Sequence, residues 1–355
     1  MPNQPLLAVV SSGVVSSVGL SAPATFAAIR GGIDAFQNTS YLDAAKLPIV
    51  GAMIPRDVLG LPGEADGLTQ GGDEKLARMV AMAATECASG FDLGKLALLL
   101  VGPEEGRLVF SRGIDACLTA CAEAFGQELH EDSRVFQHGS PGLVDALIFA
   151  RDLLLAQKVK SVLIAGVDSL LGADDIHEGL LERRVLSTGA SDGYVPGEAA
   201  GCVLVTRPAE RPVGAASCLF VAGLGTSSES CTLAARRRST GVGLSTAIRQ
   251  ALGQAGVSAH EVHARFADVT AEPYFFEEAS YAWGRLLRAA SPVGHKLHTP
   301  VTRLGHVGAA MGPLLLAFVL DEVRRGLRPL PNALIHLSTS GAARAAALLV
   351  ASYSG

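Results

Sequence analysis

The chain has 355 residues, of which 49% are hydrophobic and 40 are glycines, and its formal net charge is −5. This length can bury a large core, and the composition is typical of an α/β protein with many tight turns. The acidic balance excludes a basic footprint for nucleic acid, since the only compact basic run is Arg236 to Arg238. We interpret that run as a solvated loop, with a phosphate or carrier-protein contact as the alternative.

The cysteines and the apolar runs bear on the protein's compartment. The six cysteines include no C-x-x-C pair, so the sequence predicts neither a zinc site nor a disulfide framework. The amino-terminal apolar run has no basic region before it, and we interpret it as a first strand and not as a signal peptide. The longest uncharged apolar run, residues 307–320, is too short to span a bilayer. We therefore expect a cytoplasmic protein without a membrane span, a metal or a cofactor.

The first part of the chain predicts alternating strands and helices. Residues 6–20 read as a buried strand that breaks into a glycine turn, and Ser21 then caps a helix that ends at Gly32. Residues 41–72 are rich in Gly, Pro and Asp and predict a loop or lid. The spacing further along predicts helices over 75–89 and 113–125, a strand over 95–102, a polar helix near 174–183 and a strand over 202–206.

The stretch from Arg134 to Leu170 is the centre of this pattern. It reads as a short strand, a sharp turn Q-H-G-S-P-G-L, a buried helix and a second strand. Ser140 and Pro141 suit the cap and first turn of the helix, where unpaired N–H groups and the helix dipole face the turn. A thiol at such a helix start would have a lowered pKa and serve acyl transfer, but no cysteine stands there.

After a junction near residues 207–215, the alternation of strands and helices restarts. The predicted elements are strands at 217–224, 264–270, 333–337 and 345–351, helices at 243–255 and 276–289, and a glycine turn at 303–312 that opens a helix ending at Arg325. Two successive series suggest a duplicated α/β unit around two central sheets, with halves at residues 1–210 and 211–355. Because neither half has a polar linker at its boundary, we expect one compact unit.

Four motifs, in order along the chain, resemble those of the β-ketoacyl synthases, which have the thiolase fold. V-V-S-S-G-V-V-S-S-V-G-L-S resembles the family's first strand, and D-G-Y-V-P-G-E-A-A-G at 192–201 resembles its D-G-F-V-x-G-E-G-A-G loop. A-D-V-T-A-E-P at 267–273 falls where the family has A-H-G-T-G-T-P, and R-L-G-H-V-G-A-A-M-G at 303–312 resembles S-N-I-G-H-x-x-A-A-G. The resemblance implies duplicated α/β halves in a layered αβαβα arrangement.

The positions that carry chemistry in that family have changed. The resemblance places the family's nucleophilic cysteine at Gly139, its first histidine at Asp268 and the lysine before its second histidine motif at Val301. Only the second histidine remains, as His306. The carboxy-terminal glycine-rich gate, F-G-F-G-G-T-N-A in the family, is reduced to L-S-T-S-G-A-A-R at 337–344.

These changes predict the loss of condensing activity. Decarboxylative condensation needs an acyl acceptor on the enzyme and hydrogen-bond donors for the enolate. Gly139 can accept no acyl group, and the Asp268 carboxylate would repel a developing oxyanion. Loss of one oxyanion donor typically costs about a hundred- to a thousand-fold in rate, so the loss of both groups should abolish the reaction.

Ser140, one residue past the missing cysteine, leaves an enzymatic alternative open. In a Ser–His–Asp hydrolase or acyltransferase, His306 would deprotonate Ser140 and Asp268 would orient the imidazole. The competing interpretation is that Ser140 caps the helix, Asp268 has drifted and His306 packs at its turn. His138 is either a substitute acid or base or a turn residue paired with a backbone carbonyl. A third hypothesis keeps condensation, with one of the six cysteines as nucleophile.

Acidic and aromatic residues surround residue 273. Glu272, Glu277 and Glu278 read as a solvated helix start. The aromatic run 274–276 is either core or a hydrophobic partner surface.

Partners follow from the resemblance, which implies a homodimer, or a heterodimer with an active ketosynthase, through the edge strand next to the central helix. The favoured role is a non-catalytic subunit or adaptor that binds an acyl chain, an acyl carrier protein or another protein, as the family's chain-length-factor-like subunits do. The alternative to such a subunit is a scaffold or chaperone-like adaptor of a protein delivery system.

Overall fold

The computed structural model describes residues 4–62, 72–91, 97–105, 107, 113–211, 217–287, 296–326 and 329–353. Within these ranges the centre of the molecule is a ten-stranded sheet with the order β10-β9-β11-β12-β8-β1-β7-β6-β4-β5. Its strands are β1 (Leu7–Ser16), β4 (Ala97–Val101), β5 (Arg134–Phe136), β6 (Ser161–Ser169), β7 (Glu198–Thr206), β8 (Ser217–Ser228), β9 (Ala264–Ala267), β10 (Lys296–His298), β11 (Asn332–Ser338) and β12 (Ala343–Tyr353).

The two halves of this sheet have the same strand order. From the middle outward they run β1-β7-β6-β4-β5 and β8-β12-β11-β9-β10, so each half places its first strand beside its last, then its fourth, second and third. In each half the three outer strands are parallel to one another. The duplication predicted from the sequence is therefore confirmed. The two expected sheets are in fact continuous, because residues 7–9 pair antiparallel with residues 219–221.

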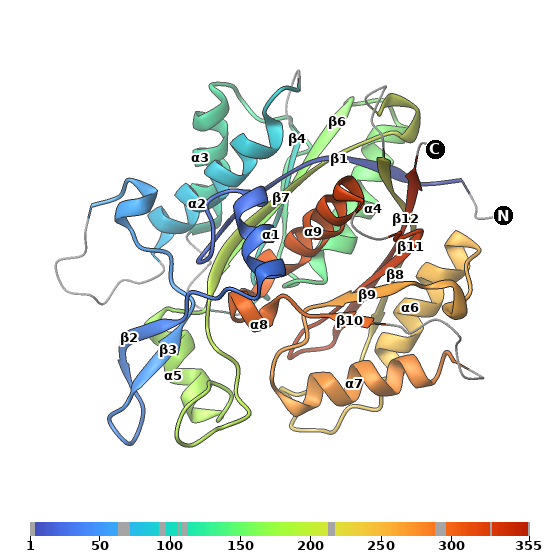
Figure 1. Ribbon diagram of the computed structural model, residues 1–355. Coiled ribbons are helices and arrows are strands. Elements are labelled where there is room, and N and C mark those ends of the chain that lie inside the picture. Colours follow the sequence, from blue (N-terminus) through green and yellow to red (C-terminus); the bar gives the residue numbers. More distant parts are fainter. Residues whose placement is uncertain are drawn as a thin grey trace.

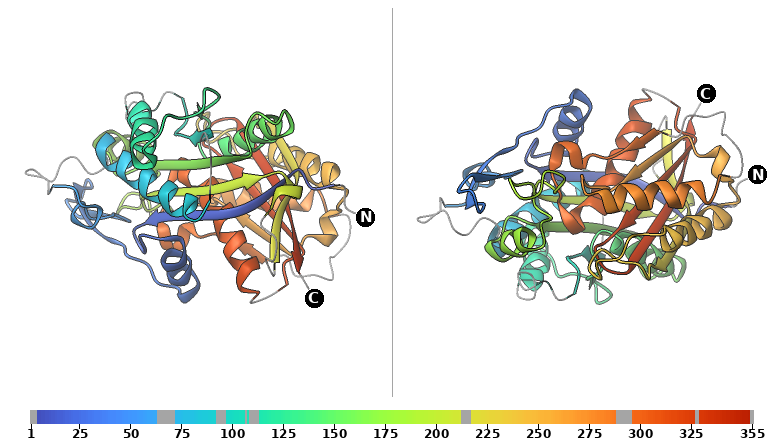
Figure 2. Two further views of the ribbon diagram at one scale, coloured as in Figure 1. Left: turned by 90° about the horizontal axis from the view of Figure 1, so that it is seen from above. Right: turned by 90° about the horizontal axis from the view of Figure 1, so that it is seen from below.

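Helices cover the sheet in layers, as Figures 1 and 2 show. On one outer side α2 packs against β1, β6 and β7 and also contacts α3, and on the other α6 packs against β8, β11 and β12 and contacts α7. Between them, α4 and α9 each contact strands of both halves, which completes the αβαβα arrangement of the thiolase-like fold. The helices are α1 (Ala22–Gly31), α2 (Asp73–Ala88), α3 (Gly113–Phe125), α4 (Gly142–Leu155), α5 (Ala173–Leu181), α6 (Val242–Ala255), α7 (Pro273–Gly284), α8 (Val301–Leu304) and α9 (Met311–Arg325).

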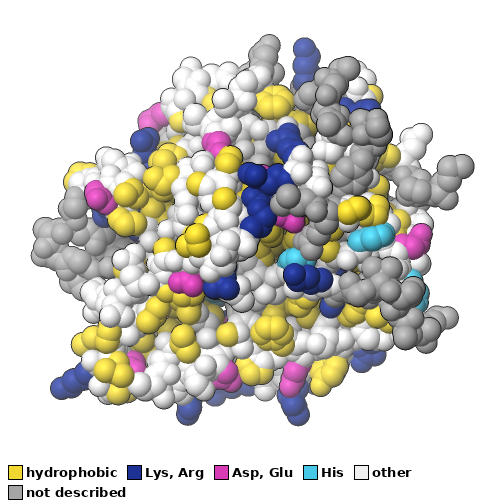
Figure 3. Space-filling model, viewed as in Figure 1, with side chains coloured by type: hydrophobic (Ala, Val, Ile, Leu, Met, Phe, Trp, Pro, Cys, Tyr) yellow, Lys and Arg dark blue, Asp and Glu magenta, His cyan; other side chains and the backbone are white. Residues whose placement is uncertain are grey.

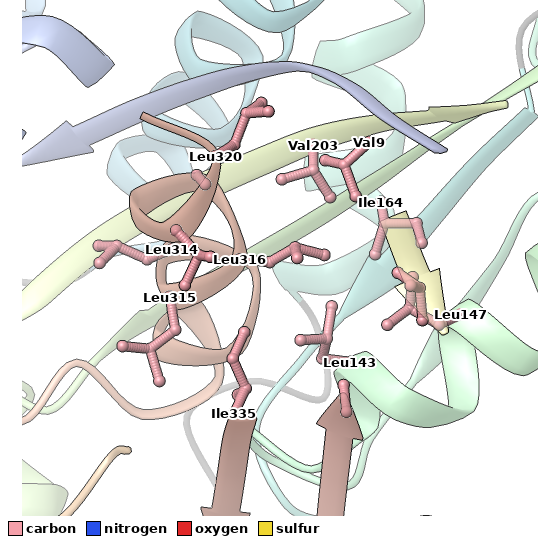
Figure 4. Packing of buried hydrophobic residues seen from close by; sticks show 14 of the residues in the cluster. Val9, Leu143, Leu147, Ile164, Val203, Leu314, Leu315, Leu316, Leu320 and Ile335 are labelled. Atoms are coloured by element: carbon pink, nitrogen blue, oxygen red, sulfur yellow. The ribbon is translucent and has the colours of Figure 1, made fainter. Parts of the chain in front are cut away.

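The largest hydrophobic cluster fills the middle layer (Figure 4). Leu143 and Leu147 of α4 face this cluster, as do Leu315 and Leu316 of α9, and all four side chains are fully buried. The two helices can approach closely because α9 carries a glycine where they meet: a β-carbon on Gly312 would lie 2.7 Å from the carbonyl oxygen of Ser140. The close contact with α9 therefore holds the start of α4 in place.

The expectation of a loop or lid over residues 41–72 is wrong in part. An antiparallel hairpin of β2 (Gln37–Leu42) and β3 (Pro48–Gly51) enters this region. The Asp43 carboxylate accepts hydrogen bonds from the backbone N–H groups of Ala45 and Leu47, each at 2.9 Å, which fixes the turn. Residues 63–71 of the predicted lid lie outside the described residues.

The surface agrees with the composition. On the face drawn in Figure 3, most acidic and basic side chains are scattered among uncharged ones, and basic side chains gather in one small group near the middle of the view, beside an acidic one. None of the helices in the described ranges combines the length and apolar character needed to cross a bilayer.

Candidate functional site

The residues singled out from the sequence meet in one cavity of about 1230 Å³. Gly139 and Ser140 lie in the turn between β5 and α4, Asp268 directly follows β9, and His306 lies between α8 and α9. The parallel strands β4, β5 and β6 of the first half and β9 and β11 of the second end at this cavity, and the carboxyl ends of parallel strands are where α/β proteins gather functional side chains. The fold thus brings together the candidate residues from both halves.

Gly139 occupies a backbone conformation that favours glycine. Its φ is +63°, in the left-handed region. A β-carbon there would lie 3.1 Å from Cγ2 of Thr339 and 3.2 Å from Cγ of Glu104. The place that the resemblance assigns to a thiol is therefore closed in by two neighbouring side chains.

Replacing Gly139 with alanine is expected to lower the free energy of unfolding by about 1–3 kcal/mol, because the new β-carbon combines a positive φ with tight contacts. Gly60 is a matched control: its φ is +71°, and no atom lies within 4 Å of a β-carbon built there. Urea unfolding of both variants should show the larger loss for Gly139→Ala. Equal losses would mean that Glu104 and Thr339 do not restrict the site.

Ser140 and Asp268 form a buried pair. Ser140 is 5% exposed and Asp268 is 7% exposed. The Ser140 hydroxyl donates a short hydrogen bond to Oδ2 of Asp268, which also accepts the backbone N–H of Ser338 at 3.0 Å. The expected role of Ser140 as a helix cap is wrong, because α4 has Pro141 at its cap position and no side-chain cap bond. Ser140 instead ties the start of α4 to the ends of β9 and β11.

Burial raises the pKa of Asp268 to about 7, although the hydrogen bonds from Ser140 and Ser338 oppose the shift. A buried carboxylate without a cationic partner favours its neutral form. Asp268 therefore changes charge close to neutral pH, unlike an ordinary aspartate.

His306 is held by its backbone. Its N–H donates to the carbonyl of Val195 at 2.7 Å, and its own carbonyl accepts the N–H of Gly197 at 2.9 Å. The imidazole packs edge-on against the ring of Tyr194, with centroids 5.0 Å apart, and its Nδ1 is buried without a hydrogen-bond partner. Burial, reinforced by the charges of Arg184 and Arg107, lowers the pKa of His306 to about 3, so the ring is neutral at pH 7.

The hydrogen bonds of Ser140, Asp268 and His306 differ from those of a Ser–His–Asp triad. In a triad the serine donates to the histidine, and the aspartate receives the other ring N–H. Here the Ser140 hydroxyl donates to Asp268 directly, and within the described part of the chain the His306 Nδ1 meets no acceptor or donor. The three candidates share a cavity, but the proton path between serine and histidine is not formed.

Two partly buried arginines at the cavity were not anticipated from the sequence. Arg107 pairs with Asp168 at 2.9 Å and with Asp175 at 2.8 Å. Arg184 pairs with Glu272 at 2.8 Å. A positional signal exists for part of this set, because Asp168 lies near the carboxyl end of β6, one of the parallel strands that end at the cavity.

The interpretation of Glu272, Glu277 and Glu278 as a solvated helix start is wrong for Glu272 and Glu278. Glu272 is 5% exposed and Glu278 is 1% exposed, and Glu278 pairs with the fully buried Arg344 at 2.9 Å. The aromatic run is divided: Tyr274 and Phe275 are buried, while Phe276 is 45% exposed. The local sequence could not show this, because Arg344 reaches Glu278 from β12.

The remaining candidates lie as follows. His138 is 58% exposed at its side chain and pairs with the Asp145 carboxylate at 2.7 Å, so the expected backbone carbonyl partner is wrong. Val301 begins α8 and is outside the described cavity lining, whereas Arg236 to Arg238 are exposed and border the cavity. The cavity lining, as far as the structure describes it, includes none of the six cysteines, which weakens the hypothesis of a relocated thiol.

A search of the described residues for metal-ligand groups finds one cluster, His130, Glu131 and Asp132, with ligand atoms within 4.8 Å of one another. It lies between α3 and β5 and outside the cavity lining, and Asp132 already pairs with Lys158 at 3.1 Å.

No protein-family model matches the sequence, and neither does any curated protein. Solved structures do match. The ishigamide ketosynthase/chain length factor is similar with a TM-score of 0.71 and 19% identity over 97% of this chain and 99% of that one. AntDE:AntF, a type II PKS acyl-carrier protein in complex with its ketosynthase bound to the hexaketide, matches with a TM-score of 0.75 and 15% identity over 98% and 99%.

A modular ketosynthase has the same architecture. The ketosynthase from module 6 of the bacillaene synthase from Bacillus subtilis 168 matches with a TM-score of 0.72 and 11% identity, covering 97% of this chain and 72% of that one. The chain therefore has the thiolase-like fold of the ketosynthases, as the sequence motifs predicted. The cavity lining includes residues of three of the four motifs that carried the resemblance, among them Tyr194, Asp268 and His306.

Proposed function

We propose that this protein is a ketosynthase-fold subunit or adaptor without condensing activity. The observation that carries the proposal is Gly139, which offers no atom for an acyl bond at a left-handed position enclosed by Glu104 and Thr339. The pairing of Ser140 with Asp268 supports it, because the hydroxyl of the residue after Gly139 is already bound to a carboxylate. The function is then binding, of an acyl chain, a carrier protein or another protein.

The solved structures suggest which partners to try. One similar structure is described as a ketosynthase/chain length factor and another as a carrier protein in complex with its ketosynthase. We propose that this chain forms a dimer, either with itself or with an active ketosynthase, through β5, which lies at one edge of the sheet. A carrier protein is the second proposed partner.

Intact-mass spectrometry after incubation with an acyl thioester tests the loss of chemistry. We expect no acyl adduct on the wild-type chain, while an active ketosynthase treated in parallel gains one. An adduct that disappears in Ser140→Ala would overturn the proposal in favour of the hydrolase or acyltransferase alternative, because the hydroxyl of Ser140 would then be a nucleophile.

Sedimentation tests the binding role. It is measured for the chain alone, for the chain with a ketosynthase and for the chain with a carrier protein. We expect a dimer with itself or with the ketosynthase, and a further shift on adding the carrier. If the chain stays monomeric and binds neither partner, this role is contradicted. The result would favour a scaffold or chaperone-like adaptor of a protein delivery system.

A further inference from the structure

The inner part of the cavity holds more carboxyl groups than cations. Glu104, Asp168, Asp175 and Asp268 line it, together with Arg107 and Arg184. Both guanidinium groups are already paired, Arg107 with Asp168 and Asp175 and Arg184 with Glu272, which lies outside the lining. The pair of Arg184 and Glu272 is electrically balanced, and among the described residues Arg107 is the one cation that forms ion pairs with lining carboxyls, those of Asp168 and Asp175.

The pKa values of all four carboxyl groups are shifted in the same direction. Burial raises the pKa of Glu104 and of Asp168, and it raises the pKa of Asp175 to about 6 and that of Asp268 to about 7. A nearby cation favours the charged form of a carboxyl and opposes such a shift. Arg107, Arg184 and Arg344 act in this way, and their charges do not offset the effect of burial.

Apart from the Thr339 hydroxyl, whose hydrogen bond lowers the pKa of Glu104, two buried acceptors in the lining have no hydrogen-bond partner among the described residues. The Asp175 side chain is 8% exposed; its Oδ1 accepts from Arg107, while its Oδ2 is buried without a hydrogen-bond partner. The His306 Nδ1 is buried without a partner as well, and the neutral ring can accept there. Buried polar atoms in native proteins nearly always have partners, so these two atoms mark places for a donor.

We propose that the cavity binds a small amine in its ammonium form, with the Asp175 carboxylate as its main contact. An ammonium group carries three donors and one positive charge, which matches unused acceptors in a site with surplus carboxylate. Glu104, whose carboxylate is within the field of Arg107 beside Gly139, adds a second negative charge.

The basic residues at the cavity do not oppose this assignment. The Arg238 side chain is 86% exposed and pairs with Glu277 at 3.1 Å. Arg236 and Arg237 are exposed too, and solvent and salt screen such charges strongly. Asp175 lies instead on α5, whose first turn also carries Asp174. This inference deepens the proposed function, and it rests on it only in requiring a cavity free of a covalent acyl chain.

Calorimetric titration with three probes of equal carbon count tests the charge preference. The probes are 1,4-diaminobutane, 1,4-butanediol and succinate, which are cationic, neutral and anionic. We expect heat of binding with the diamine and none with the other two. Binding of the diol or of succinate as tight as that of the diamine, or no binding of the diamine at millimolar concentration, overturns the inference.

Two matched substitutions locate the site. Asp175→Asn keeps the shape of the side chain and removes its charge. We expect it to lower the affinity for the diamine by about tenfold or more, which is the effect of losing one charged hydrogen bond. Asp152→Asn is the control, since Asp152 is 57% exposed on α4 and outside the lining. Equal affinity in Asp175→Asn and wild type overturns the inference by placing the diamine elsewhere.

A second variant keeps the test decisive if Asp175→Asn does not fold. Glu104→Gln also removes one carboxylate, and we expect it to lower the affinity for the diamine severalfold. An unchanged affinity would contradict the inference. The outcome is independent of the proposed function, because acyl loading and complex formation are measured by mass spectrometry and sedimentation. Failure to bind the diamine would leave those results standing.

Discussion

Arg344→Met is expected to lower the free energy of unfolding by about 3–5 kcal/mol, because it would leave Glu278 as a buried charge without its partner. Arg344 and Glu278 have side chains 0% and 1% exposed, respectively. The guanidinium also donates to the Tyr274 hydroxyl at 2.9 Å and to the carbonyl oxygens of Gly341 and Ala343, each at 2.8 Å. Urea unfolding followed by circular dichroism measures the loss.

An exposed ion pair and a double variant serve as controls. Arg238→Met breaks the pair with Glu277 at the surface and should change stability by less than about 1 kcal/mol. Adding Glu278→Leu to Arg344→Met removes the stranded charge and should restore part of the loss. If the single variant at Arg344 costs no more than Arg238→Met, the buried pair does not hold β12 to α7.

Asp268→Asn is expected to become progressively more stable than wild type as the pH rises from about 4 to about 7. The pKa of Asp268 in the folded protein, about 7, lies above its ordinary value of 3.8 in an unfolded chain. In that window the folded state binds a proton that the unfolded state has released, so wild-type stability from this group is present at low pH and falls as the pH rises. The difference should reach the order of 3–5 kcal/mol at pH 8.

The comparison isolates this group because other titrations occur in both proteins. The pKa of His306 is about 3 in the folded protein, below its ordinary value of 6.5. His306 therefore gives the stability a pH dependence of opposite sign, which cancels when the two proteins are subtracted. Chemical denaturation at a series of pH values, with both proteins in the same buffers, gives the two profiles. Parallel profiles would show that Asp268 ionises at the pH of an ordinary aspartate in the folded protein.

Much of the fold could be predicted from the sequence because its signals are local. The apolar runs ending in glycine turns mark strands such as β4 and β6, and the spacing in 143–154 marks the buried face of α4. The repeated series of strands and helices predicted the duplication. The continuity of the sheet was missed, because a short pairing between β1 and β8 leaves no pattern in either strand.

The candidate site was predicted in its position but not in its contacts. Motif order placed Gly139, Ser140, Asp268 and His306 together, and they line one cavity. The hydrogen bond between Ser140 and Asp268 joins residues 128 positions apart, and side-chain direction at that range follows from packing and not from local sequence. For the same reason the partner of Glu278 could not be read from its helix.

The left-handed turn at residue 139 limits the side chains that this position can hold. A cysteine introduced there alone would place its side chain against Glu104 and Thr339, on a backbone that resists any residue with a β-carbon. A working thiol at this turn would therefore need coordinated changes on three separate segments of the chain.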